Sequence, residues 1–251
     1  MADFLMREDA PLTPAEWAAI DEMVVNVARK QLVGRRFVPL AGPFGAGAQV
    51  VPVGAGDDRA FIPVTTIQHD FKLAWADVAH SRQYGTPLEL APAAMAAAAC
   101  AQAEDKMIFA GLMKAKGVLK EKLGDWGTVG QAFADVVRVT GRLVEAGAYG
   151  PYAVVLPPAQ YALLHRVYGE VGQLEIAMIR EAATGGVFQS PALAPDQALV
   201  VSLEPQNFDL AVAQDLVTAY LGPDGLDHAF RVFEKLALRV KRPAAICCLT
   251  R

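Results

Sequence analysis

The residues that could carry out chemistry are few, and their spacing brings none of them together. The four histidines lack the His-x-x-x-His spacing that places two imidazoles on one helix face as metal ligands. They are spread over most of the chain, at His69, His80, His165 and His228. We interpret each as a surface or capping residue, and the sequence predicts no metal site.

The nucleophiles and carboxylates also give no catalytic pattern. Cys100 lies in an alanine-rich stretch, and Cys247 and Cys248 lie in an apolar C-terminal run. An odd number of cysteines is not a disulfide framework, so buried reduced thiols are expected. Serine is scarce, and there is no Gly-x-Ser-x-Gly turn for a hydrolase. Glu104 and Asp105 are neighbours on a predicted helix, so their side chains diverge, and a solvated face is expected. No catalytic residue is predicted.

The composition describes a folded protein with a sizeable core. The chain has 251 residues, of which 53% are hydrophobic and 20% charged, with a net charge of -4. These values exclude the disordered classes, and the acidic balance argues against a nucleic-acid partner. No apolar run approaches the roughly 18 residues of a membrane span, and no secretory signal is visible. We therefore expect a cytoplasmic protein with no membrane partner.

The first third of the chain must be a helix followed by extended segments. Thr13, Pro14 and Glu16 form a helix start with a capping box, and the helix is expected to end at Gly34. A short strand is expected at 35–40. The glycine-rich segment from Gly42 to Gly56 contains no phosphate-binding motif, so it is interpreted as an extended loop. A strand is then expected at 60–75.

The remainder mixes helices and strands without a regular alternation. Helices are expected at 92–116, at about 128–144 from a second capping box at Thr128, at 159–168 and at 174–183. Strands are expected at 152–156, 198–203, 209–213, 217–221, 230–241 and 244–249. Because strands and helices do not repeat as β-α-β, an α+β fold is predicted rather than a barrel or a doubly wound sheet.

Six segments, in order along the chain, resemble the encapsulin family of nanocompartment shell proteins. They are Leu5 to Asp21 (LMREDAPLTPAEWAAID), Gly34 to Val38 with Gly42 to Gly45 (GRRFV, GPFG), Ala103 to Gly111 (AEDKMIFAG), Gly150 to Tyr152 (GPY), Ala198 to Ser202 (ALVVS), and Gln214 to Leu216 with Tyr220. Each segment alone is weakly specific, but six in register identify the family.

The resemblance implies the fold of tailed-phage major capsid proteins (HK-ninety-seven type). In that fold the N-terminal arm and helix (1–41) join the peripheral domain, and an extended loop follows (42–74). The peripheral domain with its spine helix would occupy 75–127 and the axial domain 128–213. The C-terminal strands of the peripheral domain would occupy 214–251. The implied function is a shell subunit whose identical copies close into an icosahedral compartment.

The resemblance also implies sites. A groove for the C-terminal targeting peptide of a cargo enzyme maps to Val24, Ala28, Arg35 and Thr218, although Val24 can equally be a core residue. The five-fold pore loop maps to Tyr168, Gly169, Glu170, Val171, Gly172, Gln173 and Leu174. There a ring of Glu170 carboxylates would favour cations; an ordinary surface turn is the alternative. The implied cargo is a ferritin-like protein, a peroxidase or another redox or iron protein.

One cofactor and two other functions stay open at this point. Some encapsulins bind a flavin beside a tryptophan that matches Trp75, although a core or interface tryptophan is the simpler interpretation; no other cofactor is expected. A prophage capsid protein of the same fold is the first alternative function. The second is a bacteriocin or protease-like enzyme, which the absence of a nucleophile–base pair in the sequence disfavours.

Overall fold

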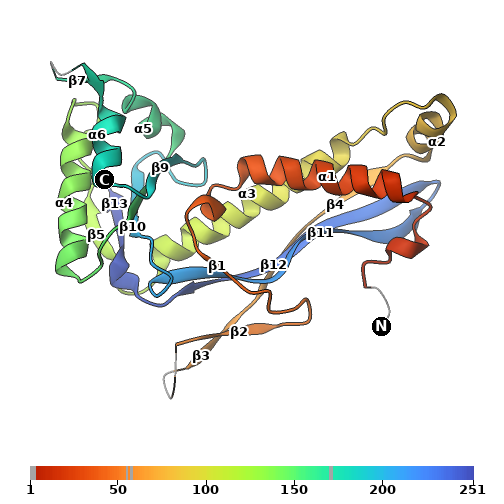
Figure 1. Ribbon diagram of the computed structural model, residues 1–251, viewed down its shortest axis with the longest axis horizontal. Coiled ribbons are helices and arrows are strands. Elements are labelled where there is room, and N and C mark those ends of the chain that lie inside the picture. The colour runs from red at the N-terminus through yellow and green to blue at the C-terminus, as the bar shows by residue number, and fades with distance from the viewer. Residues whose placement is uncertain (1–3, 55, 57–58, 170–171) are drawn as a thin grey trace.

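Two very long strands form the backbone of the larger part of the molecule. β11 (Phe208–Asp224) and β12 (Asp227–Val240) pair antiparallel, with β1 (Leu40–Ala41) and β4 (Thr65–Leu73) on their outer edges. The resulting four-stranded sheet has the order β1-β11-β12-β4 (Figure 1). The computed structural model describes every residue except 1–3, 55, 57–58 and 170–171.

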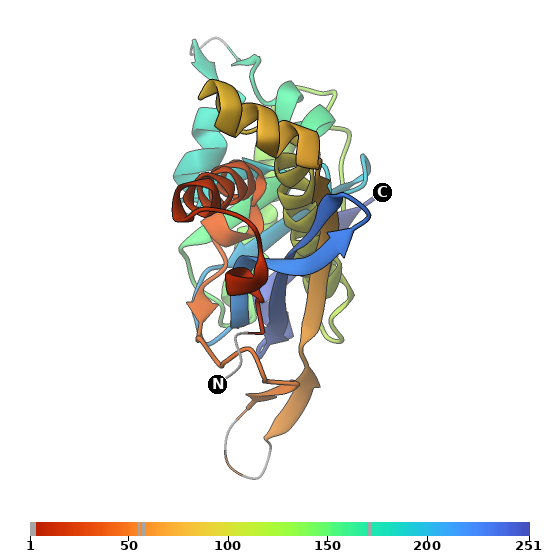
Figure 2. The same cartoon turned by 90° about the vertical axis from the view of Figure 1, so that its right-hand side faces the viewer.

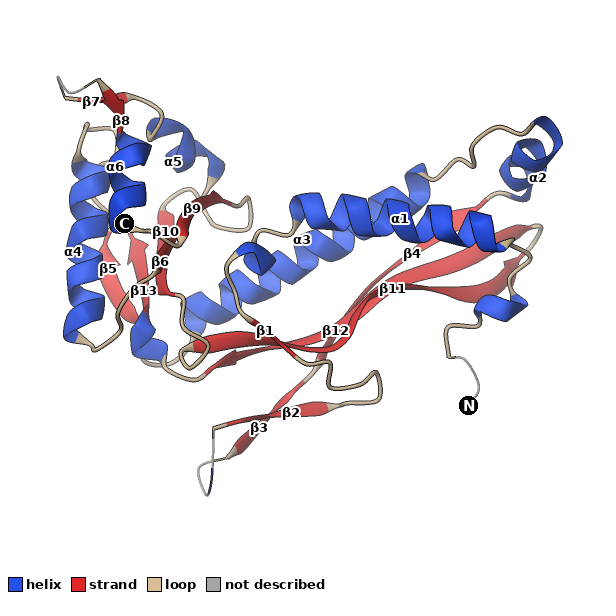
Figure 3. Ribbon diagram, viewed as in Figure 1, coloured by secondary structure: helices blue, strands red, loops and turns tan. Residues whose placement is uncertain are grey.

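Two long helices cover one face of this sheet. α1 (Pro14–Gln31) begins at the predicted capping box, in which the Glu16 N–H donates to Thr13 Oγ1 at 3.3 Å and the Thr13 N–H donates to Glu16 Oε2 at 2.7 Å. α3 (Ala91–Lys114) is the predicted long helix. Its buried alanines, such as Ala93 and Ala97, let it lie close to α1 and the strands. Figures 2 and 3 show both helices on the same side of the sheet.

A second lobe is built on a five-stranded sheet of order β5-β13-β10-β6-β9. These strands are β5 (Leu119–Lys122), β13 (Ile246–Thr250), β10 (Gln197–Ser202), β6 (Tyr152–Leu156) and β9 (Gly186–Gln189). β6 is buried along its whole length because helices pack on both of its faces. The helices of this lobe are α4 (Gln131–Glu145), α5 (Pro158–Leu163) and α6 (Glu175–Ala182).

Shorter elements complete the described part of the chain. β2 (Val50–Val53) and β3 (Ala60–Pro63) form a ribbon that projects from the body, and β7 (Val167–Tyr168) pairs with β8 (Gln173–Leu174) (Figure 1). α2 (Trp75–Tyr84) follows β4. Described 3₁₀ turns lie at η1 (Arg7–Asp9), η2 (Gly34–Arg36) and η4 (Pro243–Ala245). Among the described residues no helix is both long and apolar enough to cross a bilayer.

Several predicted elements were wrong, each because a tertiary contact overrides the local pattern. The segment 35–40 is not one strand: η2 takes up its first two residues and β1 begins only at Leu40, because Asp105 accepts the N–H groups of Val33 and Gly34 and holds the chain in a turn. The helix predicted at 159–168 stops at Leu163, and its last residues form β7, which pairs with β8. The second capping box is absent. The residue before α4 is Gly130, which has no side chain that could cap the helix and which adopts a φ of 87°.

The strands predicted around the extended loop and near the C-terminus also changed. The strand 60–75 is two strands, β3 and β4, and α2 begins at Trp75. The two strands predicted at 209–213 and 217–221 are the single strand β11, which is interrupted only by register shifts between Val212 and Gly222. The final strand and the helices at 92–116 and 174–183 are confirmed to within a few residues.

The expected domain ranges need three changes. β4 lies within the predicted loop 42–74 but is an integral strand of the four-stranded sheet. β5, within 75–127, and β13, within 214–251, both belong to the five-stranded sheet, because β13 pairs with β10 on one side and β5 on the other. β11 starts inside the range 128–213. The C-terminal segment therefore contributes a strand to each sheet: β12 to the four-stranded sheet and β13 to the five-stranded sheet.

Candidate functional site

Three adjoining hollows follow α1 along its length. The first has a volume of about 240 Å³ and is lined by Val25, Ala28, Arg29, Leu32, Arg35, Arg36, Asp215 and Leu216. The second, of about 370 Å³, is lined by Leu5, Arg7, Asp21, Val24, Val25, Leu216, Val217 and Thr218. The third, of about 470 Å³, is lined by Arg7, Glu8, Ala10, Leu12, Pro14, Trp17, Ala18 and Asp21. Each shares two residues with the next, and we call the three together the α1 groove.

The structure brings all four residues of the predicted cargo-peptide site into this groove. Ala28 and Arg35 line the first hollow, and Val24 and Thr218 line the second. Val24 is also part of the main hydrophobic core, so its two predicted roles are compatible. Both Val24 and Thr218 are nearly or fully buried and form the floor rather than the rim. Within the described chain the Thr218 hydroxyl has no hydrogen-bond partner.

The N-terminal arm forms one wall of the groove, through Arg7. The Arg7 guanidinium donates two hydrogen bonds of 2.7 Å to Asp21 on α1, and its Nε donates to the Thr218 carbonyl at 3.1 Å. It also lies 4.5 Å from the centre of the Trp17 ring, a cation–π distance. Since Arg7 and Asp21 line both the second and the third hollow, this ion pair separates the two.

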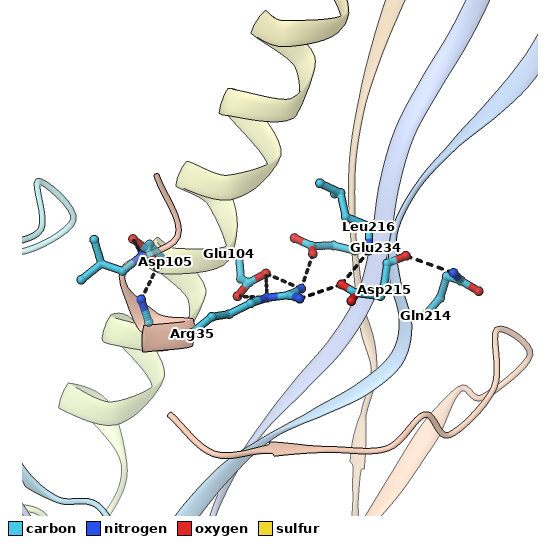
Figure 4. Close-up of polar contacts among 9 residues, drawn as sticks. Arg35, Glu104, Asp105, Gln214, Asp215, Leu216 and Glu234 are labelled. Atoms are coloured by element: carbon cyan, nitrogen blue, oxygen red, sulfur yellow. Dashed lines mark hydrogen bonds and ion pairs between the residues drawn. The ribbon is translucent and has the colours of Figure 1, made fainter. Parts of the chain in front are cut away.

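Arg35 and Asp215, which line the first hollow, belong to a cluster of charged side chains (Figure 4). The guanidinium of Arg35, on η2, binds carboxylates from three other elements. It donates to Glu104 of α3 at 2.9 Å, to Asp215 of β11 at 2.6 Å and to Glu234 of β12 at 2.8 Å. Glu104 and Glu234 have essentially no exposed surface. One cation thus ties the spine helix to the two long strands.

Three carboxylates surround the single cation of this cluster, so their mutual repulsion in a buried place disfavours ionisation of all three. Burial, and then the repulsion of Glu104 and a hydrogen bond to it, raise the pKa of Glu234 to about 9. A carboxyl group with a pKa this high holds its proton at neutral pH. Burial alone would lower the pKa of Arg35, but the hydrogen bonds and charges of Glu104 and Asp215 outweigh it, so the pKa is raised. The cluster carries a permanent cation, Arg35, that lines the groove.

Asp105 has a different structural role. Its carboxylate accepts the N–H groups of Val33 at 3.0 Å and Gly34 at 2.8 Å, which holds the chain at the end of α1. Burial raises the pKa of Asp105 to about 6, while these two hydrogen bonds act in the opposite direction. The solvated face predicted for Glu104 and Asp105 is thus wrong: both are buried, because each has a partner on another element.

Sequence reasoning missed these acids, although one signal was present. In the predicted C-terminal strand the apolar residues Phe230, Val232 and Leu236 occupy alternate positions, and Glu234 falls on the same face. A lone glutamate on a buried strand face predicts a buried partner. No comparable local signal marked Asp215, which reaches Arg35 only because β11 runs past η2.

The predicted pore loop forms the β7–β8 ribbon at the outer end of the second lobe (Figure 3). Tyr168 pairs with Gln173, and Leu174 pairs with Val167 on the other side of the ribbon. Gly169 and Gly172 have φ values of 55° and 73°, which glycine adopts without strain. Glu170 and Val171 lie outside the described residues.

The remaining predicted residues are placed as follows. Trp75 begins α2, with half of its surface exposed, and its N–H donates to Asp227 at 3.1 Å. The three cysteines are buried and free, as predicted. Burial raises the pKa of Cys100 to about 12, which keeps this thiol protonated and inert. In the part of the chain that the structure describes, no three histidine, cysteine or acidic side chains converge as a metal site would require.

Comparison with known proteins identifies the family. The model of the family described as "Encapsulating protein for peroxidase" matches residues 2–237. The type 1 encapsulin shell protein EncA of Myxococcus xanthus is 44% identical over 278 aligned positions, which cover 99% of this chain and 97% of the relative. This chain belongs to the encapsulin family. A second relative, a diheme-cytochrome–encapsulin shell fusion protein of Kuenenia stuttgartiensis, is 37% identical, with 93% of this chain and 72% of the relative covered.

Solved structures place the encapsulin fold among capsids. The virus-like particle of Pyrococcus furiosus superposes with a TM-score of 0.82 at 21% identity, covering 93% of this encapsulin and 98% of the other chain. The capsid of the Myoviridae phage XM1 gives a TM-score of 0.63 at 14% identity, covering 87% and 91%. The predicted phage-capsid fold is confirmed. The encapsulin is a shell protein, and the relatives named as shell proteins support a structural, non-enzymatic role.

Proposed function

We propose that identical copies of this encapsulin close into an icosahedral shell in the cytoplasm, and that the α1 groove faces the lumen and holds the C-terminal peptide of a cargo enzyme. The observation that carries the proposal is the convergence of Val24, Ala28, Arg35 and Thr218, from α1, η2 and β11, on two adjoining hollows. A groove with small apolar residues on its floor accepts apolar side chains of an extended peptide.

The chemistry of the groove matches a short peptide better than a small molecule. Ala28, Leu32 and Leu216 supply an apolar lining for the side chains of a bound peptide. The hollows follow most of α1, so a peptide several residues long can lie along it. A linear site of this kind binds an extended chain that orders on binding.

The cargo we propose is a ferritin-like protein, a peroxidase or another redox or iron protein. Two names support this proposal: one relative is a fusion of a diheme cytochrome with an encapsulin shell, and the family is described as an encapsulating protein for peroxidase. A cargo of this class gains from confinement, because its reactive products stay inside the shell.

The test is cargo loading by shells with an altered groove. Val25 lines the first and second hollows and is exposed on α1, so Val25→Asp puts a charge into the groove without disturbing the core. Asn26→Asp, at the neighbouring exposed position outside these hollows, is the matched control. Shells are purified from the native host, and the cargo is identified and quantified by mass spectrometry. We expect Val25→Asp shells to be empty and Asn26→Asp shells to be loaded; equal loading would contradict the proposal.

The β7–β8 ribbon is our candidate for the five-fold pore. The predicted ring of Glu170 side chains would favour cations by Coulomb attraction. Glu170→Gln is expected to slow entry of Fe²⁺ into loaded shells and to leave the entry of a neutral reagent unchanged. An equal rate of Fe²⁺ uptake in the two shells would leave the ribbon as an ordinary surface turn.

A flavin beside Trp75 is a separate proposal. It is supported by the exposure of half of the Trp75 surface, because an accessible aromatic ring can stack on a flavin. Purified shells mixed with riboflavin 5′-phosphate would show quenched flavin fluorescence and a red-shifted flavin absorption band, and Trp75→Ala shells would not. The same spectrum for both shells would assign Trp75 to an interface or packing role.

A further inference from the structure

The β2–β3 ribbon carries apolar side chains that its own subunit does not cover. Val50 and Phe61 are 51% and 62% exposed, and the ribbon projects away from the body (Figures 1 and 2). Its inner face is packed, where Val51 and Ile62 contact a small cluster on the long strands. A lone two-stranded ribbon is marginally stable in water, so the direction in which this ribbon points depends on what holds its root.

Two cations of β12 hold that root. The ammonium of Lys235 donates to the carbonyl oxygens of Ala46 at 2.6 Å and Ala48 at 2.9 Å, in the irregular segment that leads into β2. Arg239 donates to the Pro52 carbonyl, within β2, at 2.9 Å. These side chains thus make three hydrogen bonds to main-chain carbonyl groups at the start of the ribbon.

The Arg239 guanidinium is itself held in place by contacts with other residues. Its guanidinium donates two hydrogen bonds of 2.7 Å to Asp209 on β11, and Lys241 donates to the same carboxylate at 2.6 Å. The ring of Phe44, on the loop side, lies 5.4 Å from the guanidinium. The base of the ribbon is therefore fixed to two strands of the four-stranded sheet, β11 and β12.

We propose that Lys235 and Arg239 are positioning residues for assembly, which set the angle of the β2–β3 ribbon before it meets a second copy of this chain. The four residues of β2, at about 3.3 Å each, make the ribbon about 13 Å long. A tilt of the ribbon by about 15° would therefore move its tip by roughly 3 Å. A shift of that size exceeds the tolerance of a packed contact. Because every copy repeats the same contact, the error accumulates around the shell.

The variant that tests this is Lys235→Met, which keeps the side-chain stem and removes the ammonium. Ala46 and Ala48 are partly exposed, so water satisfies their carbonyl groups and the subunit still folds. Lys72→Met is the matched control, because Lys72 lies on the same sheet and pairs with the exposed Asp224 there. Lys235→Arg retains a cation and is the conservative rescue.

The measurements are particle diameters by electron microscopy, the closed fraction by size-exclusion chromatography and subunit folding by circular dichroism. We expect Lys235→Met to fold but to form about tenfold fewer closed particles, since a charge-assisted hydrogen bond contributes roughly such a factor, and those particles to vary in diameter. Lys72→Met and Lys235→Arg are expected to match the wild type.

Each other outcome overturns the inference. Lys235→Met particles with wild-type yield and diameter would show that assembly does not depend on the hydrogen bonds from Lys235 to the ribbon. Unfolded Lys235→Met chains, or equal losses in Lys72→Met, would make Lys235 a residue of general stability. The inference rests on the proposed shell, but the two fail separately: a wild-type protein that forms no closed particles refutes the shell itself.

Discussion

Replacement of Glu234 by glutamine should make the protein more stable at alkaline pH. The native carboxyl, buried beside Glu104, Arg35 and Asp215, has a pKa raised from 4.5 to about 9, whereas in the unfolded chain it ionises near 4.5. Between these values the native state holds a proton that the unfolded state has released. Raising the pH therefore lowers the free energy of unfolding, by about 1.4 kcal/mol per pH unit.

The size of the effect follows from the width of that window. From pH 5.5 to pH 8.5 the single proton costs up to about 4 kcal/mol of stability, which corresponds to a melting temperature lower by on the order of 10 °C in a chain of this length. The glutamine introduced by Glu234→Gln would be neutral at every pH and of the same shape as the protonated acid. The variant should thus melt close to the wild type at pH 5.5 and well above it at pH 8.5.

The assay is differential scanning fluorimetry of wild-type and Glu234→Gln shells at one protein concentration, in steps from pH 5.5 to pH 8.5. Glu181→Gln, an exposed substitution of the same chemistry on α6, is the control and should leave the pH dependence unchanged. The reasoning is refuted if the difference between Glu234→Gln and the wild type is the same at both ends of the range. A lower melting temperature for Glu234→Gln at pH 8.5 would refute it too.

Three further outcomes test other parts of the fold. Asp105→Ala should lower the free energy of unfolding by roughly 3 kcal/mol, measured by chemical denaturation, because it leaves two buried N–H groups unpaired. Gly34→Ala should cost about 1 to 3 kcal/mol in the same assay, since the new methyl would lie 2.7 Å from Ile108 Cδ1. A hydrogen bond from Arg82 lowers the pKa of Glu16 to about 2, so the stability from this pair is present above pH 4.5 and is lost as the pH falls towards 2. Arg82→Gln should therefore flatten the acid limb of a thermal melting profile between pH 2 and pH 4.5.

The sequence determined the elements that depend on local signals. The capping box at Thr13 and Glu16 fixed the start of α1, and the long alanine-rich run fixed α3, because caps and side-chain periodicity act within one or two turns. The alternation in β12 likewise marked its buried face. The ordered motifs identified the encapsulin family, and the four cargo-peptide residues inferred from that resemblance converge on one groove.

The tertiary structure decided everything that requires partners distant in the chain. Arg35 binds acids that lie 69, 180 and 199 residues away, so neither its burial nor the raised pKa of Glu234 is written in any local pattern. In the same way, the chain turns at η2 because Asp105 accepts the N–H groups of Val33 and Gly34 at its start. The sheet to which β13 belongs is set by pairing with β10 and β5. Burial removes water from these groups, and only the folded chain specifies which charges and main-chain groups replace it.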